Sequence, residues 1–295
     1  MPELPEVETI RRHLAPHVEG RTLRQLEILD ERWSRPLAGA ELSAALEGRA
    51  IERLGRRGKY LVWELAGEAY LLQHLRMTGT LLLDPEGAPP YTRVWLRLDD
   101  HDLAYTDPRR FGTGELALGG DALDAFFAAR LGLEPFDEEF TTTHLHALAR
   151  ASRAPVKAFL LDQKRIAGVG NIYADEALFR AGIHPLRPAN RLSKAQVEAL
   201  RDGVIASLSA GIAAKGASID DFRHPDGVQG SFQDRFLIHL REGEPCLVCE
   251  RPVRKLRAAG RGSYVCERCQ PRPRAQAAAA RSSTRRPARS AAASS

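Results

Sequence analysis

The first residues of the chain contain a group that could act as a nucleophile. If Met1 is removed, Pro2 becomes the first residue and its ring nitrogen is a free secondary amine. An α-amine has a pKa of about 7.7–8.0, so a useful fraction is unprotonated near neutral pH. Such an amine can attack a sugar or carbonyl carbon and form an iminium intermediate. Glu3 and Glu6 follow at i,i+3 spacing, which would place both carboxylates on one helix face. A proline followed by acids is also an ordinary helix start, so these residues alone leave both interpretations open.

The four cysteines form one group near the end of the chain. Cys246 and Cys249 make one Cys-x2-Cys pair, and Cys266 and Cys269 make a second pair after sixteen residues. Together they can present four thiolates to one tetrahedral Zn²⁺ and leave no open position for a catalytic water. We therefore expect a structural zinc in a reduced protein, with a redox pair or an iron–sulfur cluster as the alternative. The basic residues between the pairs are Arg251, Arg254, Lys255, Arg257 and Arg261. They suggest contact with phosphate, although a basic zinc ribbon can also bind protein.

A glycine-rich turn at residues 168–173, Gly-Val-Gly-Asn-Ile-Tyr, lies between two helical stretches. Two glycines let a backbone approach a ligand closely, and the following helix N-terminus is a ready anion site. Asn171 could cap that helix and donate to a phosphate, and Lys157, Lys164 and Arg165 add positive charge nearby. The alternative is a glycine-rich joint between two helices without a ligand.

Composition limits the class of protein. The 295-residue chain is long enough for two domains. No apolar run approaches the length of a membrane span, and no charged start followed by an apolar stretch marks a signal peptide. We therefore expect a cytoplasmic protein that acts at the bacterial nucleoid. The net charge is +5, but residues 271–295 contain six arginines and no acid, and subtracting them leaves −1 for the rest. That Ala/Arg/Ser/Pro-rich tail is predicted to be disordered; it could add non-specific DNA affinity or simply aid solubility.

The elements that must position these groups change in kind along the chain. A first helix ends near Pro16, and the region up to about residue 135 consists mainly of short strands, at 60–65, 70–72, 80–83 and 94–98, with a short helix at 40–46. Many short strands separated by polar turns predict a β-sandwich or barrel. From residue 141 the pattern is helical, at 142–150, 155–163, 171–181 and 193–215. Ser193 and Gln196 form a capping box for the last helix, and Gly216 ends it.

Six motifs in one order carry a resemblance to a known family. They are Pro2-Glu3-Leu4-Pro5-Glu6-Val7-Glu8, Gly58-Lys59-Tyr60, His74-Leu75-Arg76-Met77-Thr78-Gly79, Thr106-Asp107-Pro108-Arg109-Arg110-Phe111-Gly112, the turn at 168–173 and the four cysteines. Over residues 2–270 the chain resembles formamidopyrimidine-DNA glycosylase, the bacterial enzyme that removes oxidised purines. The start Pro-Glu-Leu-Pro-Glu is similar to this branch rather than to the endonuclease VIII branch, which usually starts Pro-Glu-Gly-Pro.

The resemblance implies an α+β multidomain fold. It comprises an N-terminal β-sandwich with flanking helices (2–130), a linker (131–140), a helix–two-turns–helix domain (141–235), a four-cysteine zinc finger (236–270) and the tail (271–295). DNA would run through the cleft between the two halves. A glycine- and polar-rich stretch at 216–231 matches the loop that covers an extruded base in this family.

The resemblance also implies catalytic roles. Pro2 would attack C1′ of the damaged nucleotide, Glu3 would act as the acid in base loss and ring opening, and Glu6 would help to position the reacting groups. Lys59 would contact DNA phosphate and aid β-elimination. Arg261 would grip phosphate and assist δ-elimination.

The remaining implied roles concern DNA. A base must leave the stack before an active site can reach C1′, and Met77, Arg109 and Phe111 match the family's side chains that fill the void. The residues matched to other DNA or phosphate contacts are His74, Tyr91, Arg153, Lys157 and Asn171. Two positions depart from the family pattern: Tyr91 stands where members often have a histidine, and Ser152 replaces a common basic residue, for which Arg153 can substitute.

The resemblance therefore implies a bifunctional DNA glycosylase and abasic-site lyase. It would excise 8-oxoguanine and formamidopyrimidines in base excision repair and then cut the strand by β,δ-elimination. Its partner would be double-stranded DNA with oxidised bases or abasic sites, its only cofactor one structural Zn²⁺, and its state a monomer without a membrane partner. The alternatives are an endonuclease VIII-like glycosylase for oxidised pyrimidines and a catalytically silent DNA-binding zinc protein.

Overall fold

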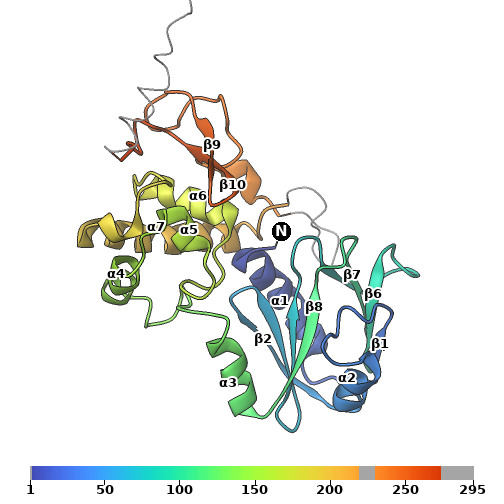
Figure 1. Ribbon diagram of the computed structural model, residues 1–295. Helices are drawn as coiled ribbons and strands as arrows, with labels where there is room; N and C mark the ends of the chain where they lie inside the picture. Colours follow the sequence, from blue (N-terminus) through green and yellow to red (C-terminus); the bar gives the residue numbers. More distant parts are fainter. Residues whose placement is uncertain (1, 219–229, 274–295) are drawn as a thin grey trace, which may run out of the picture.

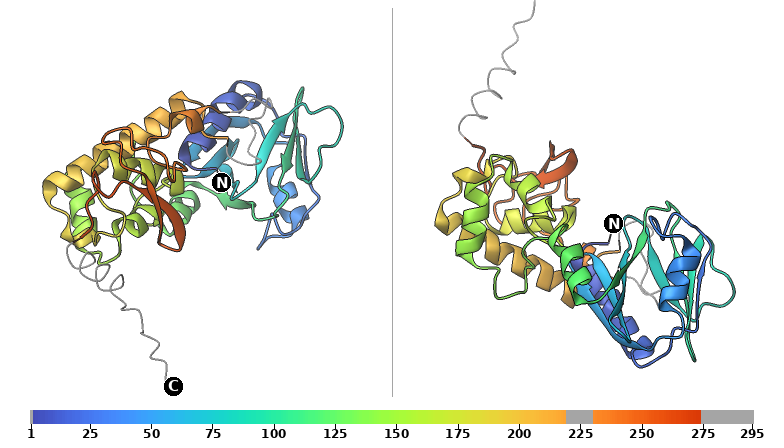
Figure 2. Two further views of the ribbon diagram at one scale, coloured as in Figure 1. Left: turned by 90° about the horizontal axis from the view of Figure 1, so that it is seen from above. Right: turned by 60° about the horizontal axis from the view of Figure 1, so that its bottom comes forward.

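The protein consists of a β-sandwich half and a helical half that carries a small C-terminal β-hairpin (Figure 1). The computed structural model describes residues 2–218 and 230–273. The two halves lie side by side in all views (Figures 1 and 2), and helix α1 (Leu4–Val18) begins near the boundary between them. The predicted base-covering loop at 216–231 and the predicted tail at 271–295 fall largely outside the described residues.

The sandwich half contains two four-stranded antiparallel sheets, ordered β1-β6-β7-β5 and β2-β3-β4-β8. The strands are β1 (Gln25–Ile28), β2 (Ile51–Arg57), β3 (Tyr60–Leu65), β4 (Ala69–His74), β5 (Thr80–Leu83), β6 (Thr92–Arg97), β7 (Asp102–Thr106) and β8 (Thr113–Leu118). The predicted strands at 60–65, 70–72, 80–83 and 94–98 are confirmed. A buried core fills the space between the sheets.

Strand β3 is buried on both faces, because its alternate side chains pack into two different apolar clusters. Leu61 and Trp63 point into the core between the sheets, whereas Tyr60 and Val62 pack beneath α3 (Gly120–Ala128) on the outer face. The sequence of this region predicts mainly strands, and α3 is a difference from that expectation. Its start is Gly119-Gly120, without a Ser, Thr, Asp or Asn cap that would have marked a helix. The short helix predicted at 40–46 is present as α2 (Gly39–Leu46).

Helix α1 (Leu4–Val18) joins the two halves. Val7, Ile10 and Leu14 pack into the sandwich core, while Leu4 packs into the core of the helical half. The helix continues past Pro16 to Val18, so the predicted end near Pro16 is two residues short. A proline this late in a helix removes a single hydrogen bond, and the following turn can still form.

The helical half contains α4 (Thr142–Arg150), α5 (Val156–Leu161), α6 (Asn171–Arg180) and α7 (Lys194–Ala213), with the 3₁₀ turns η1 (Ala189–Arg191) and η2 (Phe232–Arg235). Helix α6 packs against α7 around a shared apolar core. The predicted capping box is confirmed: Gln196 N donates to Ser193 Oγ at 3.3 Å, and Ser193 N donates to Gln196 Oε1 at 3.1 Å. Helix α7 ends at Ala213, two residues before the predicted end at 215, and Gly216, at φ +77°, lies in the turn that follows.

The C-terminal hairpin is made by β9 (Arg254–Ala258) and β10 (Arg261–Val265) and packs on α6. Its small core joins Phe179 of α6 to Ile238, Val253 and Tyr264. Within residues 2–218 and 230–273, the structure has no helix long and apolar enough to cross a membrane.

Candidate active site and nucleic-acid interface

The chain start lies at the junction of the two halves, where α1 meets α6. Pro2 is buried, and the first turn of α1 follows it directly. Leu4 N donates to Gly168 O at 3.1 Å, which ties this start to the glycine-rich turn. The amine candidate is therefore held beside residues that lie about 170 positions later in the sequence.

Glu3 occupies the N-terminus of α6. Its buried carboxylate accepts hydrogen bonds from Ile172 N at 3.1 Å and, more weakly, from Tyr173 N at 3.5 Å. Helix N-termini favour negative charge, so the anion site predicted here is real, but the chain's own carboxylate fills it. The prediction that Asn171 caps α6 is wrong, because Gly170 holds the cap position and Asn171 is the first helical residue.

The two glycines of the turn make room for α1. A Cβ on Gly170 would lie 2.2–2.5 Å from the Glu3 carboxyl group, and a Cβ on Gly168, at φ +83°, would lie 2.5–3.0 Å from Leu4. The close approach that the sequence suggested is therefore an approach of α1 to the backbone. It fixes where the Glu3 carboxylate sits.

Glu6 is buried and connects three segments. Its Oε2 accepts from Glu3 N at 2.9 Å, while its Oε1 accepts from Tyr173 OH at 2.7 Å and from Ala217 N at 2.8 Å. Burial, helped by the neighbouring Glu3 charge, raises the pKa of Glu6. Glu6 is therefore held away from solvent, and its hydrogen bonds link the backbone at Glu3 to the backbone at Ala217.

Lys59 is buried between the halves, and burial lowers the pKa of its ammonium group. The negative charge of Glu3 opposes this lowering of the Lys59 pKa, and the positive charge of Arg261 adds to it. A lysine with a lowered pKa is more readily neutral and able to accept a proton.

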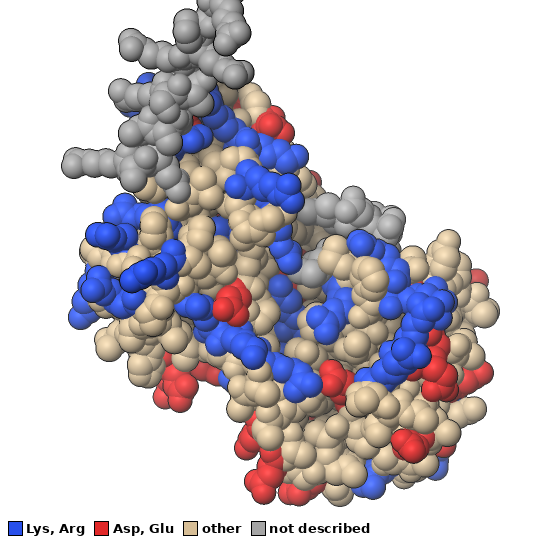
Figure 3. All heavy atoms as spheres, in the orientation of Figure 1, with Lys and Arg blue, Asp and Glu red and all other residues tan. Residues whose placement is uncertain are grey.

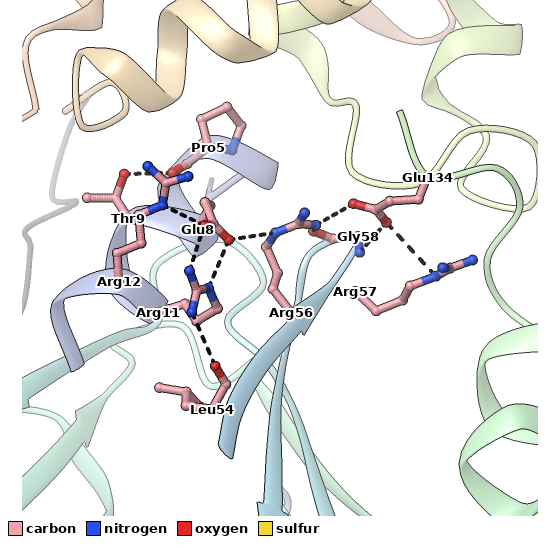
Figure 4. Close-up of polar contacts among 10 residues, drawn as sticks. All are labelled: Pro5, Glu8, Thr9, Arg11, Arg12, Leu54, Arg56, Arg57, Gly58 and Glu134. Atoms are coloured by element: carbon pink, nitrogen blue, oxygen red, sulfur yellow. Dashed lines mark hydrogen bonds and ion pairs between the residues drawn. The ribbon is translucent and has the colours of Figure 1, made fainter. Parts of the chain in front are cut away.

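A chain of ion pairs holds the residue before Lys59 (Figure 4). Glu8 of α1 accepts from Arg56 Nε at 3.2 Å, and Arg56 Nη1 donates to Glu134 Oε1 at 2.5 Å. Glu134 Oε2 in turn accepts from Gly58 N at 2.8 Å. In the sequence, Glu134 lies in the predicted linker at 131–140 and has no predicted role. Its role in holding Gly58 is seen only because the two residues are close in space.

Lys157 is not exposed, which does not fit the predicted direct contact with DNA phosphate. Its Nζ is fully buried and donates to Asp175 Oδ1 at 2.7 Å, Ser263 Oγ at 2.6 Å and Gly262 O at 3.1 Å. The sequence could not show that Asp175 and the finger hairpin surround this lysine. Through its bonds to Gly262 and Ser263, Lys157 anchors the hairpin tip, next to the exposed Arg261.

Asn171 joins the same tip. Its Nδ2 donates to Gly262 O at 3.3 Å, and its Oδ1 is buried without a partner among the described residues. One amide hydrogen of Nδ2 remains free in this arrangement for a phosphate oxygen.

His74 lies close to Lys59. The two line a cavity of about 380 Å³ together with basic side chains that include Arg76 and Lys164. Burial lowers the pKa of His74 to about 3, and its Nδ1 accepts from Arg76 N at 3.0 Å. The ring is therefore neutral with its proton on Nε2, which suits a hydrogen bond to an anion rather than an ion pair.

The expected void-filling residues lie on exposed loops at one edge of the sandwich. Met77 follows β4, and Arg109 and Phe111 follow β7; Met77 is 37% and Phe111 51% exposed, and the Arg109 guanidinium lies 4.9 Å from the Phe111 ring. Arg110 is instead held by Asp30 at 2.5 and 2.8 Å. Both arginines are exposed, but the Arg110 guanidinium is already bound to Asp30.

Two further expected DNA contacts, Tyr91 and Arg153, are also exposed. Tyr91 precedes β6 and is 59% exposed, and Arg153 lies between α4 and α5. Ser152 is buried, so only Arg153 can supply the basic group at this point. In the view of Figure 3, Lys and Arg side chains spread over the helical half, the finger and the boundary with the sandwich, whereas Asp and Glu gather mainly at the lower margin.

The four cysteines converge at the base of the finger. All four thiols are free, and their sulfurs lie within 4.8 Å of one another, with Cys246 and Cys269 at 3.9 Å and Cys249 and Cys266 at 3.4 Å. Zn–S bonds of about 2.3 Å in a tetrahedron place sulfurs about 3.8 Å apart. The donor set and its spacing fit one structural zinc.

Comparison with known proteins gives the same result for all three parts of the chain, from residue 1 to residue 272. Three family models match: "Formamidopyrimidine-DNA glycosylase N-terminal domain" over residues 1–114, "Formamidopyrimidine-DNA glycosylase H2TH domain" over 131–223, and "Zinc finger found in FPG and IleRS" over 243–272. Formamidopyrimidine-DNA glycosylase of Thermus thermophilus is 44% identical over 272 residues, which are 92% of this chain and 98% of the relative. That of Methylococcus capsulatus is 41% identical over 273 residues, 92% and 100% of the two chains.

Solved structures agree with the sequence comparison. The crystal structure of the MutM (FPG) protein from Thermus thermophilus has a TM-score of 0.83 at 43% identity and covers 91% of this chain and 98% of its own. A complex between a Lactococcus lactis FPG mutant and a Fapy-dG-containing DNA has a TM-score of 0.86 at 35% identity, with 92% and 100% coverage. A complex of Lactococcus lactis Fpg with abasic-site DNA scores 0.85 at 34% identity, with the same coverage. With its three domain types, its α+β architecture and its four-cysteine cluster, this chain belongs to the formamidopyrimidine-DNA glycosylase family.

Proposed function

We propose that this DNA glycosylase of base excision repair is bifunctional, and that it removes oxidised purines and then cuts the strand as an abasic-site lyase. The observation that carries the proposal is the convergence at the chain start: Pro2 lies beside Glu3, and Lys59 senses the Glu3 charge. An amine nucleophile, a carboxyl group and a lysine of lowered pKa are the groups that imine-based elimination needs.

In the proposed reaction, the amine of processed Pro2 attacks C1′ while the bond from C1′ to the damaged base breaks. The base leaves with that electron pair and takes up a proton from Glu3, and the amine then gives its own proton to the Glu3 carboxylate. Glu3 supplies the proton to the sugar ring oxygen as the ring opens, which leaves an iminium between Pro2 and C1′. Loss of a C2′ proton then expels the 3′ phosphate by β-elimination, and a second elimination expels the 5′ phosphate. The iminium withdraws the electron pair in these steps, so no organic cofactor is required.

The other residues bind and orient the DNA. Lys59 and His74 line one cavity and would hold a phosphate next to the reacting sugar, and Lys59 would assist β-elimination. Arg261 at the finger tip would hold a second phosphate and assist δ-elimination. Asn171 lies at the same tip, and Glu6 bonds Glu3 N, so it positions the chain start.

The base must leave the helix, and the space that it vacates must be filled. Met77, Arg109 and Phe111 would enter the duplex from the edge of the sandwich, with Tyr91 and Arg153 on the flanking backbone. The four cysteines would hold Zn²⁺, which orders the finger and takes no part in the chemistry.

Trapping with borohydride tests the proposal. A duplex with one 8-oxoguanine is incubated with the enzyme and sodium borohydride, which reduces an imine to a stable amine. We expect a covalent protein–DNA adduct with the wild type and none with protein that retains Met1. Cleavage without any adduct would contradict the imine.

A second substrate class has a specific observation in its favour. One solved structure of Lactococcus lactis Fpg, at TM-score 0.85 and 34% identity, is a complex with an oxidised pyrimidine-containing DNA. Parallel assays on 8-oxoguanine and thymine-glycol duplexes separate the two: we expect faster cleavage of the purine lesion. Cleavage of the pyrimidine lesion alone would instead favour an endonuclease VIII-like specificity.

A further inference from the structure

A buried carboxylate lies beneath the loops that carry the exposed side chains at the edge of the sandwich. Asp107 is 1% exposed and accepts hydrogen bonds on both oxygens. Oδ1 accepts from Thr78 Oγ1 at 2.5 Å and from Arg109 N at 3.1 Å. Oδ2 accepts from Phe111 N and Gly112 N, each at 2.8 Å. One side chain therefore binds the loop that carries Arg109 and Phe111 to the loop that carries Met77.

The backbone of Asp107 reaches a third loop. Asp107 N donates to Tyr91 O at 3.0 Å, and the side chain of Arg93 donates from Nε to Asp107 O at 2.9 Å. The segments 75–79, 89–93 and 107–112 thus meet at a single residue, although they follow three different strands.

Each of these loops contains a residue in a strained backbone conformation. Arg76 has φ +57°, Tyr91 φ +64° and Arg110 φ +57°. Residues other than glycine rarely adopt this left-handed region, and they stay there only where neighbouring contacts enforce it. Three such residues around Asp107 indicate loops that are fixed rather than free to vary.

Tyr105 packs against the same two loops from below. A Cβ on Gly79 would lie 2.4 Å from the Tyr105 hydroxyl oxygen, and a Cβ on Gly112 would lie 1.7 Å from it. The hydroxyl also donates to Asp107 Oδ2 at 3.4 Å. The loops are therefore packed around one buried Tyr–Asp pair without free space.

We propose that Asp107 is a positioning residue that holds the loops of Met77, Arg109 and Phe111 as one preassembled unit before DNA arrives. The inference rests on the proposed function, in which these three side chains fill the space left by the extruded base. When the loops are already ordered, DNA binding does not carry the free-energy cost of ordering them. Loss of Asp107 should therefore affect binding and reaction only on DNA that has a void to fill. Asp107 itself is too deeply buried to touch DNA.

The test uses Asp107→Asn in the full chain with zinc bound. Asparagine keeps the shape but replaces one acceptor oxygen by an amide donor, which cannot accept from two backbone N–H groups. Asp99→Asn is the matched control, because Asp99 also accepts a backbone bond (from Thr22 N at 2.8 Å) but precedes β7, whereas Asp107 follows it. Thermal melting first establishes that each variant is folded.

Two readouts separate positioning from general damage. The first is the ratio of borohydride adduct formed on an abasic site in a duplex to that formed in a single strand, which has no void. The second is the fluorescence change of 2-aminopurine placed opposite a tetrahydrofuran abasic analogue, which cannot react. For Asp107→Asn we expect the ratio to fall about tenfold, the size typical of a lost charge-assisted hydrogen bond, and the fluorescence change to be reduced. Asp99→Asn should match the wild type in both.

An unchanged ratio together with an unchanged fluorescence signal in folded Asp107→Asn would overturn the inference, as would equal losses of adduct on duplex and single strand.

If Asp107→Asn does not fold, the same two measurements are made on Thr78→Val, which removes the side-chain hydrogen bond from Thr78 to Asp107. A reduced ratio and a reduced fluorescence change support the inference, and wild-type values overturn it. A wild type that forms no adduct on any DNA would contradict the proposed function, and the 2-aminopurine signal would then still decide the role of Asp107.

Discussion

Replacing Gly170 by alanine should displace the Glu3 carboxylate while leaving the fold in place. The new Cβ would lie 2.2–2.5 Å from the Glu3 carboxyl atoms, whereas ordinary contacts begin near 3.4 Å, so the carboxylate must move by about 1 Å. A misplacement of about 1 Å at a reacting group lowers a rate by about 100-fold. The hydrogen bonds from Ile172 N and Tyr173 N would be weakened, at a cost of about 1–3 kcal/mol in the free energy of unfolding.

The assay is single-turnover excision from a duplex with one 8-oxoguanine, with denaturant unfolding measured in parallel. The matched control is Gly120→Ala, because a Cβ at Gly120 meets nothing within 4 Å and the residue opens helix α3. The control should keep the wild-type rate. Wild-type excision by folded Gly170→Ala would refute the argument that this glycine sets the position of Glu3.

Three further predictions concern Lys157, His74 and the metal site. Lys157→Met removes the buried lysine partner of Asp175, which then keeps its 2.8 Å contact with His239 Nδ1. The free energy of unfolding should fall by about 3 kcal/mol. Denaturant unfolding checks this, and an unchanged midpoint would count against a buried ion pair. Burial lowers the pKa of His74 from 6.5 to about 3, so the folded protein binds a proton at this ring less readily than the unfolded chain does. The free energy of unfolding is therefore highest above pH 6.5 and decreases as the pH falls below 6.5, by about 2 kcal/mol at pH 5. His74→Gln should therefore narrow the difference in stability between pH 8 and pH 5, and an equally large difference in the variant would contradict the shift. Cys249→Ser should lose the zinc and weaken binding to abasic-site DNA, because the finger orders around the metal; zinc analysis and a binding titration check both, and normal affinity of verified zinc-free protein would contradict the role of the finger.

The sequence predicted those features that depend on neighbours along the chain. The alternation in 60–65 indicated strand β3, and the capping box of Ser193 and Gln196 marked the start of α7. The two Cys-x2-Cys pairs indicated a single metal site, because each pair forms its own tight turn. Helix α3 lacked such a local signal, since it begins at a glycine and is only nine residues long.

Features that depend on distant partners could not be predicted. The burial of Lys157 follows from Asp175 and from Ser263, which is more than 100 residues away. The glycine pair at 168 and 170 correctly indicated a close approach, but the approaching group is the start of α1 rather than a ligand. The motif containing Asp107 was recognised for its exposed residues, while the carboxylate that fixes them carried no signal of its own.

The covalent role of the chain start can be measured directly on the trapped complex. The borohydride-reduced adduct is digested with trypsin and with nuclease, and the peptide that carries the sugar remnant is identified by mass spectrometry. We expect the remnant on the peptide of residues 2–11, at the nitrogen of Pro2, with Met1 absent. A remnant on a lysine such as Lys59, or active enzyme that still retains Met1, would contradict it.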